Sequence, residues 1–202
     1  MTALEIVDED GADALSMRTL AQRLNSGTAT LYRHFTSRAE LVAAVVDRVF
    51  GSVEIDVEKL SALPWQEACK AGARSMFDGL RRHHNVTPLL ADDVPTGPNA
   101  LATRERMLAF LLGNGFPPEL AAKSYATLAR YVLGFAMQLG TDPPDDASAA
   151  ATFRHLDPSR FPATVAIAEH LPVPWEDEFT FGLDLITDGL ARALDHGLRR
   201  GG

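Results

Sequence analysis

The sequence of 202 residues lacks the features that indicate secretion, membrane insertion or a disulfide framework. It has a single cysteine, Cys69, which excludes an internal disulfide and, at an apolar helical position, indicates a small buried hydrophobe. It has no run of about 18 apolar residues and no signal-type segment. We therefore expect a soluble cytoplasmic protein without a membrane span.

The short motifs of common enzyme classes are also missing. G-x-S-x-G, G-x-G-x-x-G and Walker A sequences are absent, which removes the basis for nucleophilic, dinucleotide and P-loop chemistry. His83 and His84 with Asp92 and Asp93 suggest a metal site, but adjacent histidines point to different sides of a helix. No His-x-x-x-His or Cys-x-x-Cys spacing supports them. We expect no enzymatic activity, no metal and no cofactor.

Acidic residues are absent from one particular window, residues 14–39, although the chain has a net charge of −8. The same window contains Arg18, Arg23, Arg33 and Arg38. Phosphate oxygens need cationic donors, whereas an acidic chain does not coat nucleic acid indiscriminately. The charge pattern therefore indicates one local, directed contact with DNA.

The apolar pattern of this window predicts a helix, a tight turn and a second helix. Ser16 begins the first helix, residues 25–27 break its period, and residues 28–35 resume it with Leu31 and Phe35 facing inward. The inward face of the first helix is formed by Met17, Leu20, Ala21 and Leu24. On spacing alone the motif fits both DNA binding and an ordinary helical hairpin with a solvated basic face.

The segments LSMRTLAQRL (15–24), TLYRHF (30–35) and SRAELV (37–42) resemble the DNA-binding domain of the TetR family of transcriptional regulators. The resemblance implies contacts with double-stranded DNA over a palindromic operator. Tyr32, His34 and Arg38 would hold phosphates, and Thr28, Thr30 and Arg33 would face bases or their flanking phosphates. The full set of implied DNA-binding residues is Arg18, Thr28, Ala29, Thr30, Tyr32, Arg33, His34 and Arg38.

Helical periodicity continues through the rest of the chain, with no convincing alternating strand, so we predict an all-α fold. The domain boundary is placed near residue 50, which gives a three-helix helix-turn-helix DNA-binding domain (1–50) and a larger helical effector-binding and dimerisation domain (51–202). The acidic cluster at residues 8–13 is expected to be solvated, and residues 142–151 to form a loop. The expected helices span residues 2–10, 38–50, 65–83, 99–114, 118–140, 161–169 and 175–198.

The second half resembles the effector domain of the tetracycline-repressor branch in four segments. These are PWQ (64–66), VPT (94–96), LAFL (108–111) with Gly115 and Phe116, and FGLDLITDGL (181–190). The resemblance implies that residues 118–140 and 175–198 pack with those of a second copy as a four-helix bundle, giving a homodimer. The alternative is that their apolar residues form one buried core in a monomer.

By family position, a cavity for a small organic effector would be lined by Gly72, Met76, Leu90, Met107, Tyr125 and Gln138. Leu90 stands where tetracycline-binding members use a histidine to hold a magnesium–drug complex, and the other family histidine aligns near Val53. We therefore expect an apolar or amphipathic effector and no metal. The alternative for each lining residue is simple core packing.

Together these features predict a sequence-specific DNA-binding transcriptional regulator, a repressor that a small organic effector releases from a palindromic operator. The alternative is a helical small-molecule-binding or scaffolding protein without specific DNA binding.

Overall fold

The computed structural model describes residues 1–53, 55–90, 94–138 and 146–200, and this part of the chain is helical and contains no strand. The predicted all-α class is confirmed. None of the described helices combines the length and apolar character that a membrane span requires. The longer helices are α1 (Thr2–Asp10), α2 (Met17–Arg23), α4 (Arg38–Ser52), α6 (Trp65–Arg82), α7 (Pro98–Gly113), α8 (Pro118–Gln138), α9 (Asp146–Arg154) and α11 (Trp175–Arg200).

The chain divides into two compact units, Met1–Gly140 with Thr187–Gly202, and Thr141–Ile186. In the first unit α8 packs against α6 and α7, and α4 packs against α1, α6 and α7. In the second unit, α9 packs against α10 (Pro162–Ala166) and the 3₁₀ helix η3 (Ala168–His170). The cavity and the helix-turn-helix described below both belong to the first unit.

The N-terminal helices begin and end where local backbone chemistry requires. Gly11, with φ of 87°, ends α1, a conformation that favours glycine. The Ser16 hydroxyl caps α2 by accepting from the Thr19 N–H at 3.0 Å. Asn25 then adopts a left-handed φ of 49°, which makes the turn before α3 (Thr28–Leu31). The predicted helix, turn and helix are thus present.

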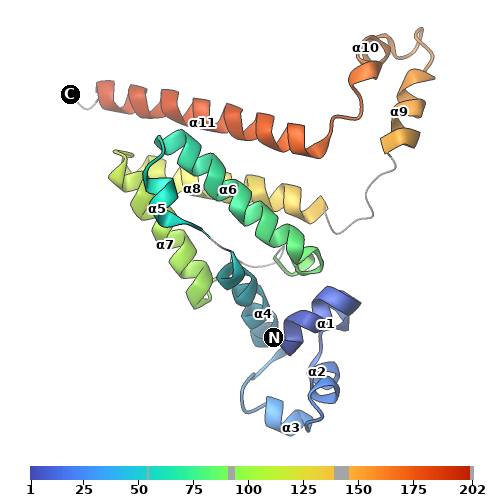
Figure 1. Ribbon diagram of the computed structural model, residues 1–202, viewed down its shortest axis with the longest axis vertical. Helices are drawn as coiled ribbons and strands as arrows, with labels where there is room; N and C mark the ends of the chain where they lie inside the picture. Colours follow the sequence, from blue (N-terminus) through green and yellow to red (C-terminus); the bar gives the residue numbers. More distant parts are fainter. Residues whose placement is uncertain (54, 91–93, 139–145, 201–202) are drawn as a thin grey trace. The chain divides into compact units, whose positions relative to one another are not determined.

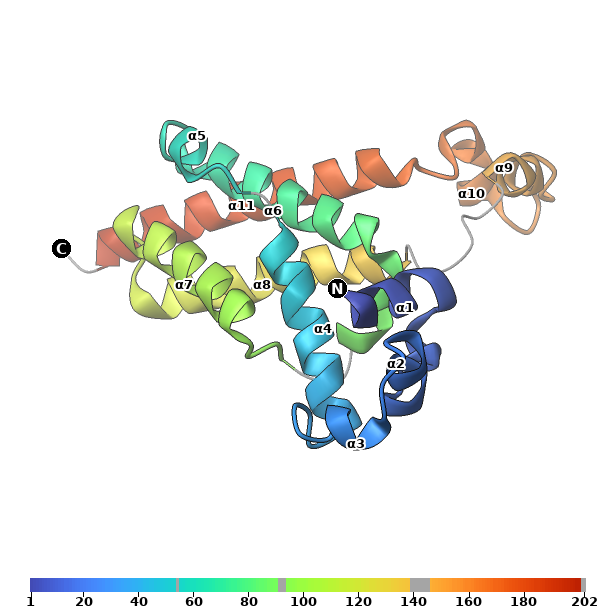
Figure 2. The same cartoon turned by 60° about the horizontal axis from the view of Figure 1, so that its bottom comes forward.

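Helix α4 connects the first three helices, α1 to α3, to the helices that follow it (Figures 1 and 2). The Ser37 side chain accepts from the Glu40 N–H at 3.2 Å, and the Glu40 carboxylate accepts from the Thr36 N–H at 2.6 Å. The bond from the Thr36 N–H, together with one from the Thr36 hydroxyl, lowers the pKa of Glu40. The start of α4 is therefore fixed shortly after the end of α3.

The middle of α4 holds the start of α7 through a buried carboxylate. Asp47 is 9% exposed and accepts from the Asn99 and Ala100 N–H groups at 2.9 and 3.0 Å, and from Asn99 Nδ2 at 2.8 Å. Two N–H groups of the first turn of α7 are thereby satisfied, although the N-cap residue Gly97 has no side chain to do so. Gly97 is required here, because a Cβ at this position would overlap the Asp47 side chain.

Three expectations from the sequence are wrong in detail. Leu24, placed on the inward face, is 45% exposed because α2 ends at Arg23. Residues 146–151, expected to form a loop, lie in α9, and the preceding residues 142–145 fall outside the described residues. The helices α5 (Val57–Ser61) and η2 (His84–Leu90) were not predicted.

Cys69 on α6 is 1% exposed, as expected for a small buried hydrophobe, and burial raises the pKa of its thiol to about 11. Because the reactive species is the thiolate, we expect a disulfide reagent at pH 8 to modify the native protein about 100-fold more slowly than the urea-unfolded protein. The native rate should rise as the pH approaches the raised pKa. Absorbance of the released thiol measures both rates; equal rates would contradict the burial of this thiol.

Candidate functional site

Most of the residues predicted to contact DNA are exposed, and they belong to α2, to α3 with the turn after it, and to the start of α4. Thr30 is half-buried, and the other seven residues of the predicted set are exposed, with Tyr32 at 56%. Leu31 is buried and Phe35 half-buried, as the helical period required. The second helix is shorter than predicted, because α3 ends at Leu31 and residues 32–34 continue as a turn.

Arg38, predicted to hold a phosphate, also has a structural role. Its Nε donates to the Leu15 carbonyl at 3.0 Å and its Nη2 to the Ala12 carbonyl at 3.4 Å. A guanidinium has five N–H donors, so three remain for a phosphate oxygen. The two bonds tie α4 to the segment before α2, which would orient the remaining donors.

The basic window is less positive than its composition indicates, because Arg23 is paired within the chain. Its Nη1 and Nη2 donate to the Glu9 carboxylate at 2.7 Å and the Asp10 carboxylate at 2.9 Å. The hydrogen bond and charge of Glu9, with those of Asp10, raise the pKa of Arg23. Both carboxylates are exposed, as expected for a solvated acidic cluster, but they also pair with Arg23, which was not expected.

Asp8, a third member of that cluster, contacts the end of α6. Its carboxylate lies 2.9 Å from His83 Nδ1, and its carbonyl accepts from Asn85 Nδ2 at 2.9 Å. His83 therefore holds α1, and Asp92 and Asp93, the other members of the suggested metal site, lie outside the described residues. Among the described residues, no group of three or more His, Cys, Asp or Glu side chains is arranged to hold a metal ion.

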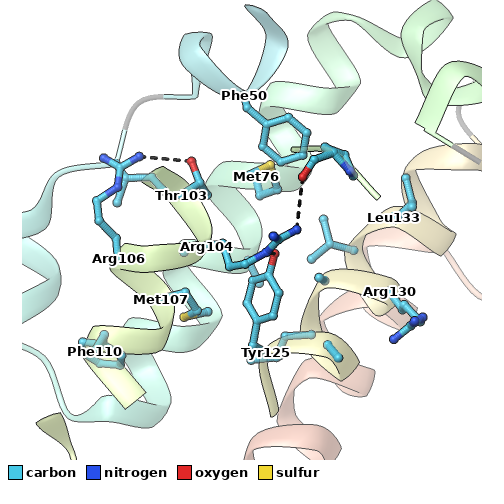
Figure 3. A pocket seen from close by; sticks show the side chains of 18 of the residues that line it. Phe50, Met76, Thr103, Arg104, Arg106, Met107, Phe110, Tyr125, Arg130 and Leu133 are labelled. Carbon is cyan, nitrogen blue, oxygen red and sulfur yellow. Dashed lines mark hydrogen bonds between the residues drawn. The ribbon is translucent and has the colours of Figure 1, made fainter. Parts of the chain in front are cut away.

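A cavity of about 610 Å³ lies among α4, α6, α7 and α8 (Figure 3). Its wall is mostly apolar, with Phe50, Met76, Met107 and Phe110 prominent among the lining side chains. Such a volume and lining are typical of sites for small organic molecules. Its polar lining side chains are Ser61, Thr103, Arg104, Arg106, Tyr125 and Arg130.

Five of the six residues expected at an effector site line this cavity: Gly72, Met76, Leu90, Met107 and Tyr125. Gln138 is exposed near the end of α8 and does not line it. The three arginines of the lining were missed. Arg104 lies one helical turn before Met107, so helical spacing from Met107 was the signal that could have revealed it.

Comparison with known proteins then separates DNA binding from plain helical packing. The family model described as "Bacterial regulatory proteins, tetR family" matches residues 2–45, and "Tetracyclin repressor-like, C-terminal domain" matches residues 61–194. The chain belongs to the TetR family of transcriptional regulators. It is therefore a DNA-binding helix-turn-helix regulator, and the alternative of a scaffold without DNA binding is set aside.

Individual TetR-family relatives agree with this assignment. An "HTH-type transcriptional regulator" of Saccharopolyspora erythraea is 32% identical over 169 residues, which cover 84% of this chain and 65% of that protein. This chain thus matches slightly less than two thirds of that regulator's length. The "HTH-type transcriptional repressor DrrR1" of Streptomyces coeruleorubidus is 28% identical over 200 residues, covering 93% of this chain and 74% of the repressor.

Among solved structures, the TetR family protein ActR of Streptomyces coelicolor is similar over nearly its whole length. Its complex with (S)-DNPA has a TM-score of 0.85 and 32% sequence identity, covering 95% of this chain and 94% of that one. Its complex with actinorhodin has a TM-score of 0.83 at the same identity, covering 96% and 94%.

Proposed function

We propose that this TetR-family chain is a repressor that leaves its operator when a small organic molecule occupies the cavity of about 610 Å³. The observation that carries the proposal is that Phe50, on the wall of the cavity, belongs to α4, the helix that follows directly behind the recognition helix. Relatives named as repressors and the ligand complexes of ActR support it. The chain then acts by binding, without catalysis.

The same helix, α4, also marks the boundary between the two functional parts of the chain. We place the boundary between DNA-reading and effector-binding parts near residue 50, where α4 reaches the cavity. Arg18, Thr28, Ala29, Thr30, Tyr32, Arg33, His34 and Arg38 are proposed as the DNA-contacting set. Their exposure beside a helix-turn-helix supports this assignment.

A homodimer suits both the family and the surfaces of the long helices. Phe181 and Leu185 lie one turn apart on α11 and are 63% and 58% exposed. Large apolar side chains exposed in a stripe are typical of an interface. Two copies would place two recognition helices about 34 Å apart, the repeat of successive major grooves on a palindrome.

The proposed release mechanism is a shift between two conformations of the dimer. Arg104 and Met107 of α7 line the cavity, and the first turn of α7 is bonded to Asp47 of α4. A ligand that displaces α7 therefore biases the orientation of α4 and of the helix-turn-helix. The favoured spacing of the recognition helices no longer matches successive major grooves.

The proposal is tested by fluorescence anisotropy of DNA fragments flanking the gene, titrated with the protein at two salt concentrations. We expect saturable binding to one palindromic fragment, weakened at least about tenfold between roughly 50 and 200 mM salt as phosphate contacts require. Scrambled DNA of the same composition is the control. Flat curves for every fragment at low salt would contradict operator binding. Operator affinity that stays unchanged when a ligand occupies the cavity would contradict the release mechanism.

A further inference from the structure

The charged side chains that line the cavity are all of one sign. Arg104, Arg106 and Arg130 belong to the wall, and its described lining residues include no aspartate or glutamate. Arg106 and Arg130 are exposed, whereas Arg104 is half-buried. In Figure 3 the Arg104 guanidinium lies between Tyr125 on one side and Phe50 and Met76 on the other.

Within the described residues, the hydrogen bonds of Arg104 go to neutral groups and do not compensate its charge. Its Nε donates to the Tyr125 hydroxyl at 3.2 Å and its Nη2 to the Pro95 carbonyl at 3.2 Å. Both acceptors are neutral, and no carboxylate in the described part of the chain pairs with it. Its guanidinium carbon lies 5.8 Å from the centroid of the Tyr125 ring, an arrangement that offsets only part of the cost of removing a cation from water.

The same two bonds hold the guanidinium in place while leaving donors available. Three of the five N–H donors have no partner among the described residues. The Tyr125 hydroxyl accepts from Arg104 and keeps its own proton to donate. A planar guanidinium with adjacent free donors is suited to an oxyanion, because charge-assisted and bidentate hydrogen bonds are the strong ones.

We propose that the effector is an amphipathic organic anion whose negatively charged oxygen group binds Arg104 and the Tyr125 hydroxyl. Its apolar body lies against Met76, Met107 and Phe110, which form the neighbouring wall. This inference rests on the proposed function of the cavity as the effector site, and it adds the sign of the ligand's charge.

Two fluorescent probes with one skeleton test the charge separately from the cavity. 8-Anilinonaphthalene-1-sulfonate is an anion, and N-phenyl-1-naphthylamine is the same ring system without the sulfonate. Each is titrated into the full chain without DNA. Arg104→Met removes the charge, and Arg48→Met, an exposed arginine of α4 outside the cavity, is the matched control. Gly72→Phe places a ring in the cavity, which Gly72 lines, and a Cβ at this position would meet nothing within 4 Å.

We expect Arg104→Met to weaken binding of the sulfonate about 30-fold, the size of a charge-assisted hydrogen bond, and to leave the neutral amine within about threefold. Arg48→Met should change the affinity for neither probe, and Gly72→Phe should weaken the binding of both.

If Gly72→Phe weakens the binding of both probes but Arg104→Met affects both affinities equally, the anionic ligand is excluded and the cavity remains the effector site. Saturable binding of neither probe, or binding indifferent to Gly72→Phe, would overturn the cavity assignment as well. Arg104→Lys, with an expected intermediate loss for the sulfonate, keeps the test decisive should Arg104→Met fail to fold.

Discussion

The double substitution of Tyr32 and Arg33 by alanine is expected to weaken operator binding at least about 100-fold at both salt concentrations. Both side chains are exposed, and neither makes a hydrogen bond or ion pair within the described part of the chain. An arginine contact to DNA contributes about 1–3 kcal/mol, and a two-fold operator repeats the loss in both half-sites. Anisotropy against the operator fragment measures the affinity.

The matched control is Arg48→Ala, which removes the same charge from an exposed position of α4. It should reduce affinity by no more than a few-fold, and both variants should unfold at the temperature of the parent protein. Retention of tight, sequence-specific binding by the double variant would refute the assignment of this surface as the DNA contact. A large fall in unfolding temperature would instead show that the two side chains support the fold.

A second large effect is expected from Asp47→Ala, which should lower the free energy of unfolding by about 3 kcal/mol. The substitution removes an almost fully buried carboxylate with three hydrogen bonds and leaves the N–H groups of Asn99 and Ala100 without their acceptor. Ala100 is buried, and a buried group left unsatisfied costs about 1–3 kcal/mol, to which the loss of the two bonds from Asn99 adds. Denaturant unfolding followed by circular dichroism measures the change.

The control for this substitution is Glu105→Gln, which removes an exposed carboxylate from α7 itself and should cost less than about 0.5 kcal/mol. A double-mutant cycle with Asn99→Ala isolates the side-chain bond from the two backbone bonds. A loss of unfolding free energy below about 1 kcal/mol for Asp47→Ala would mean that the Asp47 hydrogen bonds do not stabilise the start of α7. The proposed coupling from the cavity through α7 and α4 to the DNA would then be contradicted.

The sequence predicted the features that local chemistry determines. The Ser16 cap and the turn at Asn25 follow from side-chain and backbone preferences within a few residues, and the structure shows both. The misread segment 146–151 contains Ala147 and the run 149–151. Alanine has the highest helix propensity, and this should have outweighed the prolines before it.

Contacts between distant residues could not be predicted from periodicity. Asp47 meets Asn99 across 52 positions and Asp8 meets His83 across 75, so no local pattern reports either pair. The cavity residues were reached through family resemblance, which located apolar positions well. It gave no information on Arg104, because the charge in a ligand site depends on the ligand of the individual protein.

The pairing of Arg23 with Glu9 and Asp10 affects how the protein is shared between its operator and other DNA. Non-specific affinity depends on the number of phosphates that free cations neutralise, and a bacterial genome offers millions of competing sites. An arginine already engaged by two carboxylates adds little to that background attraction. The regulator therefore spends less time on irrelevant DNA, and a larger share of its copies is available to the sequence that it controls.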